Sequence, residues 1–187
     1  MADHATTHDP ALAGDYVIDP RHSRVSFAVR HMMVTWVRGV FTAFEGTAHI
    51  DPDVPSNSRV DVVIDVTSID TGVADRDRHL RTGDFFDAER FPTISFTSTS
   101  VERDNDDWSI TGDLAIRGVT RQVTVPFEFG GQALDPQGNV RAGFEGAATI
   151  NRTDWGLSYN ATLETGGVLI SDKVKLALDI SAIRAMH

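Results

Sequence analysis

The feature that most limits the fold of this 187-residue chain is a hydrophobic alternation with a period of two residues. Val25, Phe27 and Val29 share one apolar face, and similar runs start near residues 40, 60, 94, 108, 123, 142 and 174. Successive side chains of a β-strand point to opposite faces, so this period predicts strands with one dry face and one wet face. Such strands are typical of antiparallel sheets.

Turn-forming residues separate these runs, as in Asp51-Pro52-Asp53, Asp104-Asn105-Asp106 and Pro136-Gln137-Gly138-Asn139. We count about eight strands, evenly spaced, with no change of composition that would mark a linker. The fold class predicted is all-β, as an antiparallel sandwich or a closed barrel. A barrel of roughly eight strands has an interior that side chains fill or that holds one small ligand.

The length and composition fit one domain. Hydrophobic residues make up 41% of the chain, which is enough for a sizeable core. Residues 1–14 are small, polar and unpatterned, and we expect a disordered tail there. Residues 15–187 form the predicted domain.

The charge balance narrows the range of partners. The net charge is −10 and the pI is about 5.0, which disfavours nucleic acid and broad docking onto anionic membranes. There are no cysteines, so disulfides and thiolate chemistry are excluded. No stretch has the pattern of a signal peptide or a membrane span, and we expect a soluble cytoplasmic protein.

Two segments break the alternation. The first, residues 31–37 (HMMVTWV), is apolar without strict alternation and fits either a short helical or irregular lid or a bulged strand junction. The second, residues 75–82, predicts a short helix with an ion pair between Asp77 and Arg81 and with Gly83 as its C-terminal cap. Three apolar residues in and after this helix are predicted to turn inward as a plug: Leu80, Phe85 and Phe86.

Catalytic and metal-binding motifs are absent from the sequence. No serine lies in a G-x-S-x-G elbow, and the histidines are spread singly without an H-E-x-x-H pair. We therefore expect neither an enzyme nor a metal site. An anion site built from Arg76, Arg78 and Arg81, with Arg117, Arg121 or Arg152 from other segments, is an alternative. Neighbouring aspartates nearly neutralise the first three arginines, however, and a salt-bridged helix surface is favoured.

Small residues recur on the faces predicted to point inward, at Gly46, Ala48, Gly112, Ala142, Gly146 and Ala148. Small inward side chains leave volume, so a tunnel for an apolar chain is one interpretation. Tapered packing in a filled barrel is the other. If the tunnel exists, a tryptophan at Ala148 is expected to block it.

Four blocks of sequence, taken together, resemble the YceI family. They are DPRHSRVSFAVRHMMVTWVRGVFTAFEGTAHID, SIDTGVADRDRHLRTGDFFDAERFPTISFTSTSVE, ITGDLAIRGVTRQVTVPFEFGG and AGFEGAATINRTDWGLSYN. The resemblance runs from about Tyr16 to Ile183. It implies an extended, antiparallel, eight-stranded, lipocalin-like barrel with one or two short helices and a long internal tunnel. It also implies a bound lipid such as a polyisoprenoid, an isoprenoid quinone or a fatty-acyl compound.

We therefore expect a non-catalytic protein that binds, sequesters or transports a long apolar lipid, with transient membrane contact for lipid exchange and a homodimer as further expectations. The predicted wall residues are Phe27, Val29, Phe44, Ile64, Phe96, Leu114, Ile116, Phe127, Phe144, Ile150, Leu176 and Leu178. Four more are predicted at the mouth or head group: His31, Trp36, Arg38 and Trp155. The alternatives are an enzyme acting on an isoprenoid diphosphate or quinone, and a ligand-free structural or stress protein.

Overall fold

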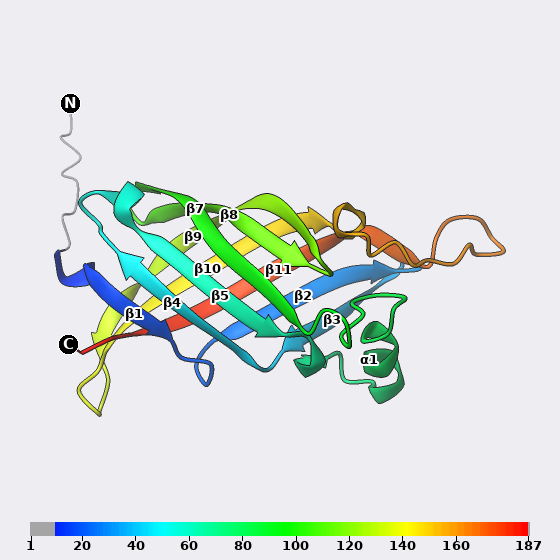
Figure 1. Cartoon of the computed structure of the whole chain (residues 1–187), viewed down its shortest axis with the longest axis horizontal. Coiled ribbons are helices and arrows are strands. Elements are labelled where there is room, and N and C mark those ends of the chain that lie inside the picture. Colours follow the sequence, from blue (N-terminus) through cyan, green and yellow to red (C-terminus); the bar gives the residue numbers. More distant parts are fainter. Residues whose placement is uncertain (1–9, 187) are drawn as a thin grey trace.

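The computed structural model describes residues 10–186, which form one elongated barrel (Figure 1). Within this part of the chain there are eleven strand segments and one α-helix. The strands are β1 (Gly14–Ile18), β2 (Arg24–His31), β3 (Thr35–Phe41), β4 (Phe44–Ile50), β5 (Arg59–Asp65), β6 (Ile69–Asp70), β7 (Thr93–Asp104), β8 (Asp107–Ile116), β9 (Val119–Leu134), β10 (Val140–Asn151) and β11 (Ile170–Arg184).

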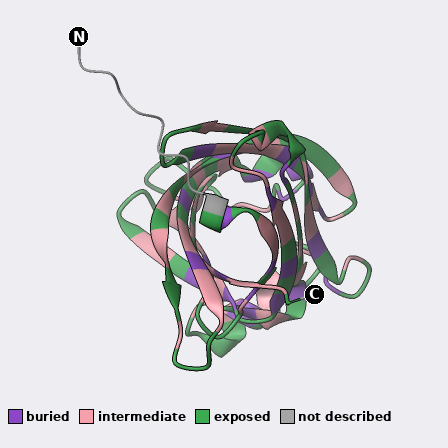
Figure 2. Ribbon diagram, turned by 90° about the vertical axis from the view of Figure 1, so that its left-hand side faces the viewer, coloured by how far each residue is buried: buried purple, intermediate pink, exposed green. Residues whose placement is uncertain are grey.

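All strand pairs are antiparallel, and the sheet closes on itself. The order β1-β4-β5-β7-β8-β9-β10-β11 returns to β1, because Tyr16 of β1 pairs with Arg184 of β11. β2 continues along β11 beyond β1, β3 pairs with β2, and β6 pairs with β3. β1 with β2, β3 with β4, and β5 with β6 thus act as three interrupted strands. The prediction of an eight-stranded antiparallel barrel is confirmed, and Figure 2 shows the ring end-on.

The pairing of β9 with β10 stops before the end of both strands. Phe127 pairs with Gly146, and no residue from 119 to 126 pairs with β10. The residue that follows this last pair is Pro126, which has no N–H to offer to a neighbouring strand. The 3₁₀ turn η4 (Arg152–Trp155) contacts β9 at this gap. The pairing of β9 with β10 thus ends next to Pro126, and a groove lies between the two strands beyond this point.

The α-helix is α1 (Ala74–Leu80), close to the predicted range, but its polar contacts differ from the prediction. Asp77 does not pair with Arg81; it is buried and accepts hydrogen bonds from the backbone N–H and the hydroxyl of Thr71. Arg81 donates instead to the carbonyls of Thr67 and Ile69. Both side chains form hydrogen bonds with the segment before α1. Partners from that segment cannot be predicted from the helix sequence alone. Gly83 lies beyond the helix and does not cap it.

The disordered tail was predicted to reach residue 14, but residues 10–14 belong to the folded structure. Residues 1–9 lie outside the described residues, but residues 10–14 are ordered as the 3₁₀ turn η1 (Pro10–Leu12) and the start of β1. Leu12 is completely buried, and its carbonyl accepts a hydrogen bond from the Tyr16 hydroxyl at 3.0 Å. The side-chain amide of Gln132 donates to the carbonyl of Ala11. This segment closes the end of the barrel that lies near both termini.

The segment HMMVTWV forms neither a lid nor a bulged strand junction. It is the end of the β2–β3 hairpin, in which His31 pairs with Thr35. The N–H of Val34 donates to the carbonyl of His31, and both intervening residues have left-handed backbone conformations (Met32 φ 52°, Met33 φ 58°). Two further 3₁₀ turns, η2 (Pro55–Asn57) and η3 (Val66–Ser68), complete the described structure.

Candidate functional site

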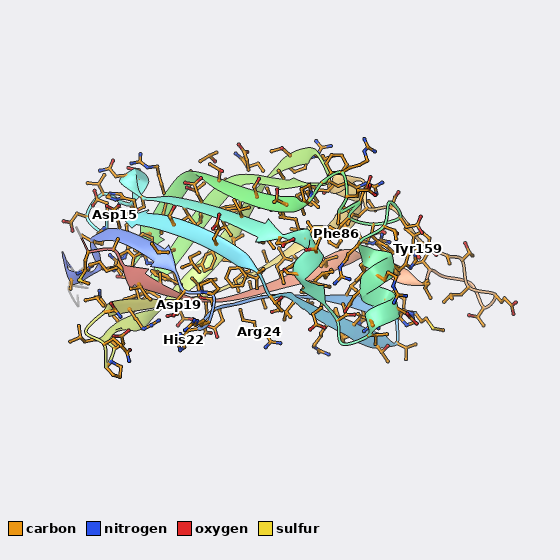
Figure 3. The ribbon with its side chains drawn as sticks, turned by 60° about the horizontal axis from the view of Figure 1, so that its bottom comes forward. Asp15, Asp19, His22, Arg24, Phe86 and Tyr159 are labelled. Carbon is orange, nitrogen blue, oxygen red and sulfur yellow. The ribbon has the colours of Figure 1, made fainter. Side chains whose placement is uncertain are left out.

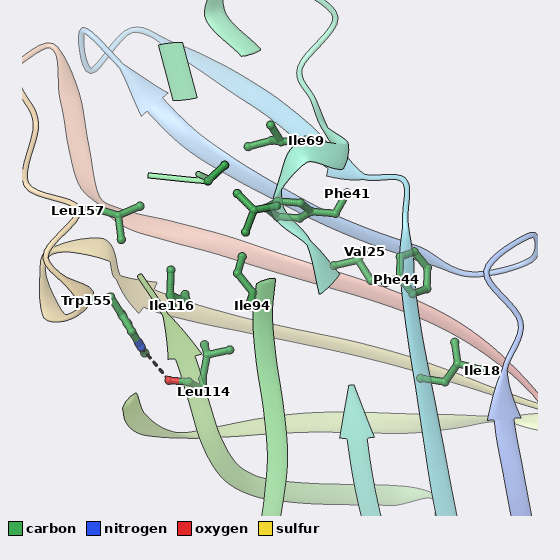
Figure 4. Packing of buried hydrophobic residues seen from close by; sticks show 12 residues of the cluster. Ile18, Val25, Phe41, Phe44, Ile69, Ile94, Leu114, Ile116, Trp155 and Leu157 are labelled. Atoms are coloured by element: carbon green, nitrogen blue, oxygen red, sulfur yellow. Dashed lines mark hydrogen bonds between the residues drawn. The ribbon is translucent and has the colours of Figure 1, made fainter. Parts of the chain in front are cut away.

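The candidate site is a cavity of about 520 Å³ inside the barrel. This volume lies within the range of roughly 300–1,000 Å³ typical of small-molecule sites. Its wall is almost entirely apolar and is built from the inward residues of every long strand. The packed residues around its α1 half include Val25, Phe41, Phe44, Ile94 and Leu114 (Figure 4).

Fourteen of the sixteen predicted site residues line this cavity: Phe27, Val29, His31, Phe44, Ile64, Phe96, Leu114, Ile116, Phe127, Phe144, Ile150, Trp155, Leu176 and Leu178. The alternation places them there, because side chains two residues apart share a face. Their contact with a ligand stays a prediction. Trp155 is buried and donates from its indole N–H to the carbonyl of Leu114 at 2.9 Å.

Trp36 and Arg38 do not line the cavity. They flank Val37, whose side chain does line it, and therefore point to the outside of β3. The Trp36 ring lies between Arg30 and Lys175, whose charged groups are 4.6 and 4.7 Å from the ring centroid. Trp36 and Arg38 were predicted at the mouth of the tunnel, but the structure places both on the outer surface of the barrel.

The sequence suggested that the inward glycines leave empty space in the barrel. In the structure, aromatic rings occupy that space. A Cβ atom at Gly146 would lie 2.4 Å from the Phe127 ring, and one at Gly112 would lie 2.5 Å from the Phe96 ring. Phe27 covers Gly39 in the same way. Each glycine thus lets an aromatic ring lie against the barrel wall instead of projecting into the interior. The cavity remains open because the rings are held to the side.

The inward alanines have different positions. Ala48 lines the cavity, whereas Ala142 is completely buried in the packing near the termini. Ala148 borders a small groove between β9 and β10, at the gap in their pairing, and is not among the residues that line the main cavity. A tryptophan at Ala148 is therefore no longer the substitution of choice for blocking the interior.

The segment that follows α1 covers one end of the barrel. Leu80, Phe85 and Phe86 line the cavity, as the plug predicted from the sequence requires. Figure 3 shows Phe86 and Tyr159 at this end. His79 is held by Asp84 at 2.8 Å, and its ring stands edge-on to those of Phe85 and Tyr159 at 5.1 and 5.0 Å. The histidine therefore serves as a structural hydrogen-bonding partner within this covering segment.

Three arginines are among the lining residues of the cavity: Arg30, whose guanidinium lies against Trp36 on the outer face, and Arg76 and Arg152 at the α1 end. Arg152 is buried and donates to four backbone carbonyls, those of Leu157, Tyr159, Ile170 and Ser171. Burial lowers the pKa of Arg152, and the exposed carboxylate of Asp172, 3.6 Å away, opposes this shift. Arg76 donates to the hydroxyl and carbonyl of Thr71. The sequence offered Arg76 and Arg152 only as members of an alternative anion site, and their contacts with carbonyl groups and Thr71 were not predicted.

The remaining members of the arginine cluster face away from the cavity. Arg78 forms an exposed ion pair with Asp75, and Arg81 is engaged by backbone carbonyls. These contacts agree with the favoured interpretation of a salt-bridged surface. Among residues 10–186, no group of three or more histidine and acidic side chains is arranged to hold a metal ion.

The other end of the cavity is closed by tight packing. Leu12, Tyr16, Val101 and Trp108 belong to one buried cluster there. Trp108 lines the cavity, and its buried indole N–H has no hydrogen-bond partner within the described part of the chain. This donor was not recognised from the sequence, where nothing separates a satisfied tryptophan from an unsatisfied one.

An ion-pair cluster outside the cavity joins two turns that are distant in sequence. Asp19 accepts from both His22 and Arg141 at 2.7 Å, and Arg141 also binds Asp135 at 2.8 Å. Hydrogen bonds from Arg141 and His22 lower the pKa of Asp19 to about 2. Burial raises the pKa of Asp135, but hydrogen bonds from Asn139 and Arg141 outweigh it and lower the value to about 2. The β1–β2 turn, where Figure 3 labels Asp19 and His22, is thereby tied to the β9–β10 hairpin.

The comparison with known families decides the relationship, because the YceI-like domain matches residues 16–182. The chain belongs to the YceI-like family. Protein YceI of Escherichia coli is 44% identical over 176 residues, covering 93% of this chain and 89% of that protein. A UPF0312 protein of Pseudomonas aeruginosa is 39% identical over 180 residues, covering 95% and 91%.

Solved structures show the same barrel. BcnA of Burkholderia cenocepacia superposes with a TM-score of 0.77 at 24% identity, covering 88% of this chain and 98% of that one. A polyisoprenoid-binding domain from Saccharophagus degradans, implicated in plant cell wall breakdown, superposes with a TM-score of 0.69 at 17% identity, covering 91% and 98%. At these identities the structural likeness establishes the fold.

Proposed function

We propose that this YceI-like protein binds a long apolar lipid, of the polyisoprenoid, isoprenoid quinone or fatty-acyl type, inside its barrel and carries it between sites. The observation that carries the proposal is the cavity of about 520 Å³ with an almost wholly apolar wall. Removing an apolar chain from water is worth about 0.8 kcal/mol per CH₂ group. A preformed cavity also keeps the ordering cost of binding low.

The relatives support this proposal. A structure with the same fold is described as a polyisoprenoid-binding domain, which is a statement about that protein. The present chain has a cavity in the corresponding barrel. We propose the same class of ligand here on the strength of the cavity together with the fold.

We propose binding without catalysis. Three of the polar side chains that line the α1 end already have structural partners: His79 is paired with Asp84, Arg76 with Thr71, and Arg152 with backbone carbonyls. A catalytic acid or base must reach the reacting group of its substrate directly or through one water. Groups held in this way favour a role in shaping the end of the cavity.

Two neighbouring residues of β5 provide the test. Ile64 points into the cavity, and Val63 points outward and is 40% exposed. Ile64→Trp is expected to reduce the binding of geranylgeraniol and of the apolar dye N-phenyl-1-naphthylamine, because the larger side chain occupies lumen volume. Val63→Trp, the matched control, is expected to bind as the wild type does.

Native mass spectrometry and dye fluorescence measure the two outcomes, and circular dichroism checks that both variants keep the β-rich fold. Equal binding by Ile64→Trp and Val63→Trp would show that the cavity is not the binding site. A wild-type protein that takes up neither ligand and purifies without any lipid-sized adduct would support the ligand-free alternative.

A further inference from the structure

The tip of the β2–β3 hairpin exposes three consecutive apolar side chains. Met32, Met33 and Val34, which we call the hairpin tip, are 45%, 61% and 73% exposed. Val168, in the segment beside it, is 41% exposed, and the two segments are joined by a hydrogen bond from the Met32 N–H to the Leu169 carbonyl at 2.8 Å. Exposed apolar groups that cluster in this way are typical of interaction surfaces.

The backbone of the hairpin tip favours residues other than the ones present. Met32 and Met33 both have positive φ angles, a region in which side chains with a Cβ atom are strained. Turns of this kind are normally formed by Asn-Gly, which relieves the strain. The chain instead carries two methionines at positions where they add strain and stay in contact with solvent. Folding alone does not explain this choice.

The surface behind the hairpin tip is basic, in a chain whose net charge is −10. Residues 24–41 contain three arginines and no aspartate or glutamate. On the outer face of this hairpin and the adjoining β11, Trp36 lies between Arg30 and Lys175. Together with the exposed Arg38 these residues form what we call the basic band. A tryptophan among cations, directly behind apolar side chains, matches the layered chemistry of a membrane interface.

The hairpin tip also lies at the end of the cavity. His31 and Leu169, the neighbours of the tip in sequence and by hydrogen bond, both line the cavity. Figure 1 shows the β2–β3 hairpin and the loop before β11 at the end of the barrel where α1 lies, away from the two termini. Apolar material that leaves the cavity at this end passes beside the hairpin tip.

We propose that the hairpin tip and the basic band form a docking surface for a lipid bilayer that contains anionic lipids. Met32, Met33 and Val34 enter the interface, Trp36 lies at the level of the head groups, and Arg30, Arg38 and Lys175 face the lipid phosphates. The net charge of −10 disfavours contact between anionic lipids and the surface outside the basic band. The surface goes beyond the proposed lipid binding and supplies a place where the cargo can be exchanged.

The shape of the surface favours a bilayer over a second copy of the chain. A stable protein interface buries about 800 Å² on each partner, which requires roughly 20–30 residues in a fairly flat patch. The hairpin tip consists of only three exposed apolar residues. A bilayer, unlike a protein, accommodates single projecting side chains without a complementary surface.

The turn itself offers a decisive variant. Replacing Met32 by Asn and Met33 by Gly removes the apolar side chains and installs the residues that the backbone prefers. We expect the thermal midpoint to stay the same or rise while vesicle binding falls by about tenfold or more, because two apolar side chains that enter the bilayer are lost. Leu134→Asn, which removes a side chain that is 72% exposed on the β9–β10 hairpin, is the matched control and is expected to bind as the wild type does.

Binding is measured by flotation with vesicles of phosphatidylcholine, alone and with phosphatidylglycerol, and without any apolar cargo. Tryptophan fluorescence gives a second readout, since Trp108 and Trp155 are buried and Trp36 is the partly exposed one. Arg38→Gln combined with Lys175→Gln is expected to weaken the preference for phosphatidylglycerol and its salt dependence. Dye binding in the cavity, measured without vesicles, should be unchanged in every variant, which separates this proposal from the proposed function.

Three results would overturn the proposal. One is a wild-type protein that floats with neither type of vesicle. Another is equal flotation of the wild type and the Met32→Asn/Met33→Gly variant. The third is a wild-type dimer, seen by sedimentation, that the same variant converts to monomer, since the hairpin tip would then be covered by a second copy of this chain.

Discussion

The pairing of an inward glycine with an aromatic ring makes a quantitative prediction at Gly146. A Cβ atom at this position would lie 2.4, 2.6 and 2.8 Å from three carbons of the Phe127 ring, and no backbone atom is among its nearest neighbours. Carbon atoms in contact are normally about 3.5–4.0 Å apart. In Gly146→Ala the ring therefore has to move by roughly 1 Å, and the lumen lies on its free side.

The expected energetic cost follows from two opposing effects. Overpacking of this kind costs about 1–3 kcal/mol, whereas replacing a strand glycine by alanine returns roughly 0.5–1 kcal/mol. Gly143→Ala on the same strand is the matched control, because its Cβ atom would meet only the Gly131 carbonyl oxygen at 3.9 Å. Gly146→Ala should therefore be less stable than Gly143→Ala by about 1–3 kcal/mol.

Urea unfolding followed by circular dichroism measures this difference, and binding of geranylgeraniol measures the narrowing of the lumen. Gly146→Ala should bind more weakly than Gly143→Ala, and adding Phe127→Leu to Gly146→Ala should restore part of the binding. If both glycine variants have the same stability and the same affinity, the rings are not held aside by the glycines, and the account of the open lumen is wrong.

Three other predictions concern the remaining contacts. Because Asp19 and Asp135 have pKa values lowered to about 2, their stabilising effect is present above about pH 4 and is lost as the pH falls towards 2. Arg141→Gln should therefore move the midpoint of acid unfolding to higher pH. Circular dichroism measures this midpoint, and an unchanged value would contradict the prediction. Arg152→Met should lower the free energy of unfolding, measured in urea, by about 3 kcal/mol, because it leaves buried carbonyls without donors. A loss below about 1 kcal/mol would mean that water replaces the guanidinium as the donor. Leu12→Ala should cost about 2–4 kcal/mol and should accelerate dye release in stopped-flow measurements through the end near the termini; a release rate equal to that of the wild type would show that this end is not closed by Leu12.

The barrel and most of its lining could be predicted because a two-residue period assigns each side chain to one face of the wall. Trp36 and Arg38 could not be assigned in this way, because residues 31–37 do not alternate strictly. The inward face also changes from odd positions in β3 (Val37, Phe41) to even positions in β4 (Phe44, Ile50). The pairing of Gly146 with Phe127 could not be predicted, because it depends on the register between two strands. The register is fixed by the whole sheet rather than by local sequence.

The charged and terminal residues were mispredicted for a different reason. Arg152 is buried because the segment from 156 to 170 brings several backbone carbonyls around it, and those carbonyls become its partners only in the folded chain. Leu12 lies in a stretch without any periodic pattern, yet it closes one end of the barrel. Both depend on contacts between segments distant in sequence, which local patterns do not contain.

The interrupted pairing at Pro126 has a consequence for how the molecule fluctuates. Three side chains, those of Val123, Ile150 and Trp155, line both the main cavity and the groove between β9 and β10. No paired residues join the two strands along this stretch, so separating them locally breaks side-chain packing but no rung of the sheet. Local opening with few hydrogen bonds to break costs the least free energy. We therefore expect local separation of β9 from β10 beyond Pro126 to be the motion of the barrel wall that costs the least free energy.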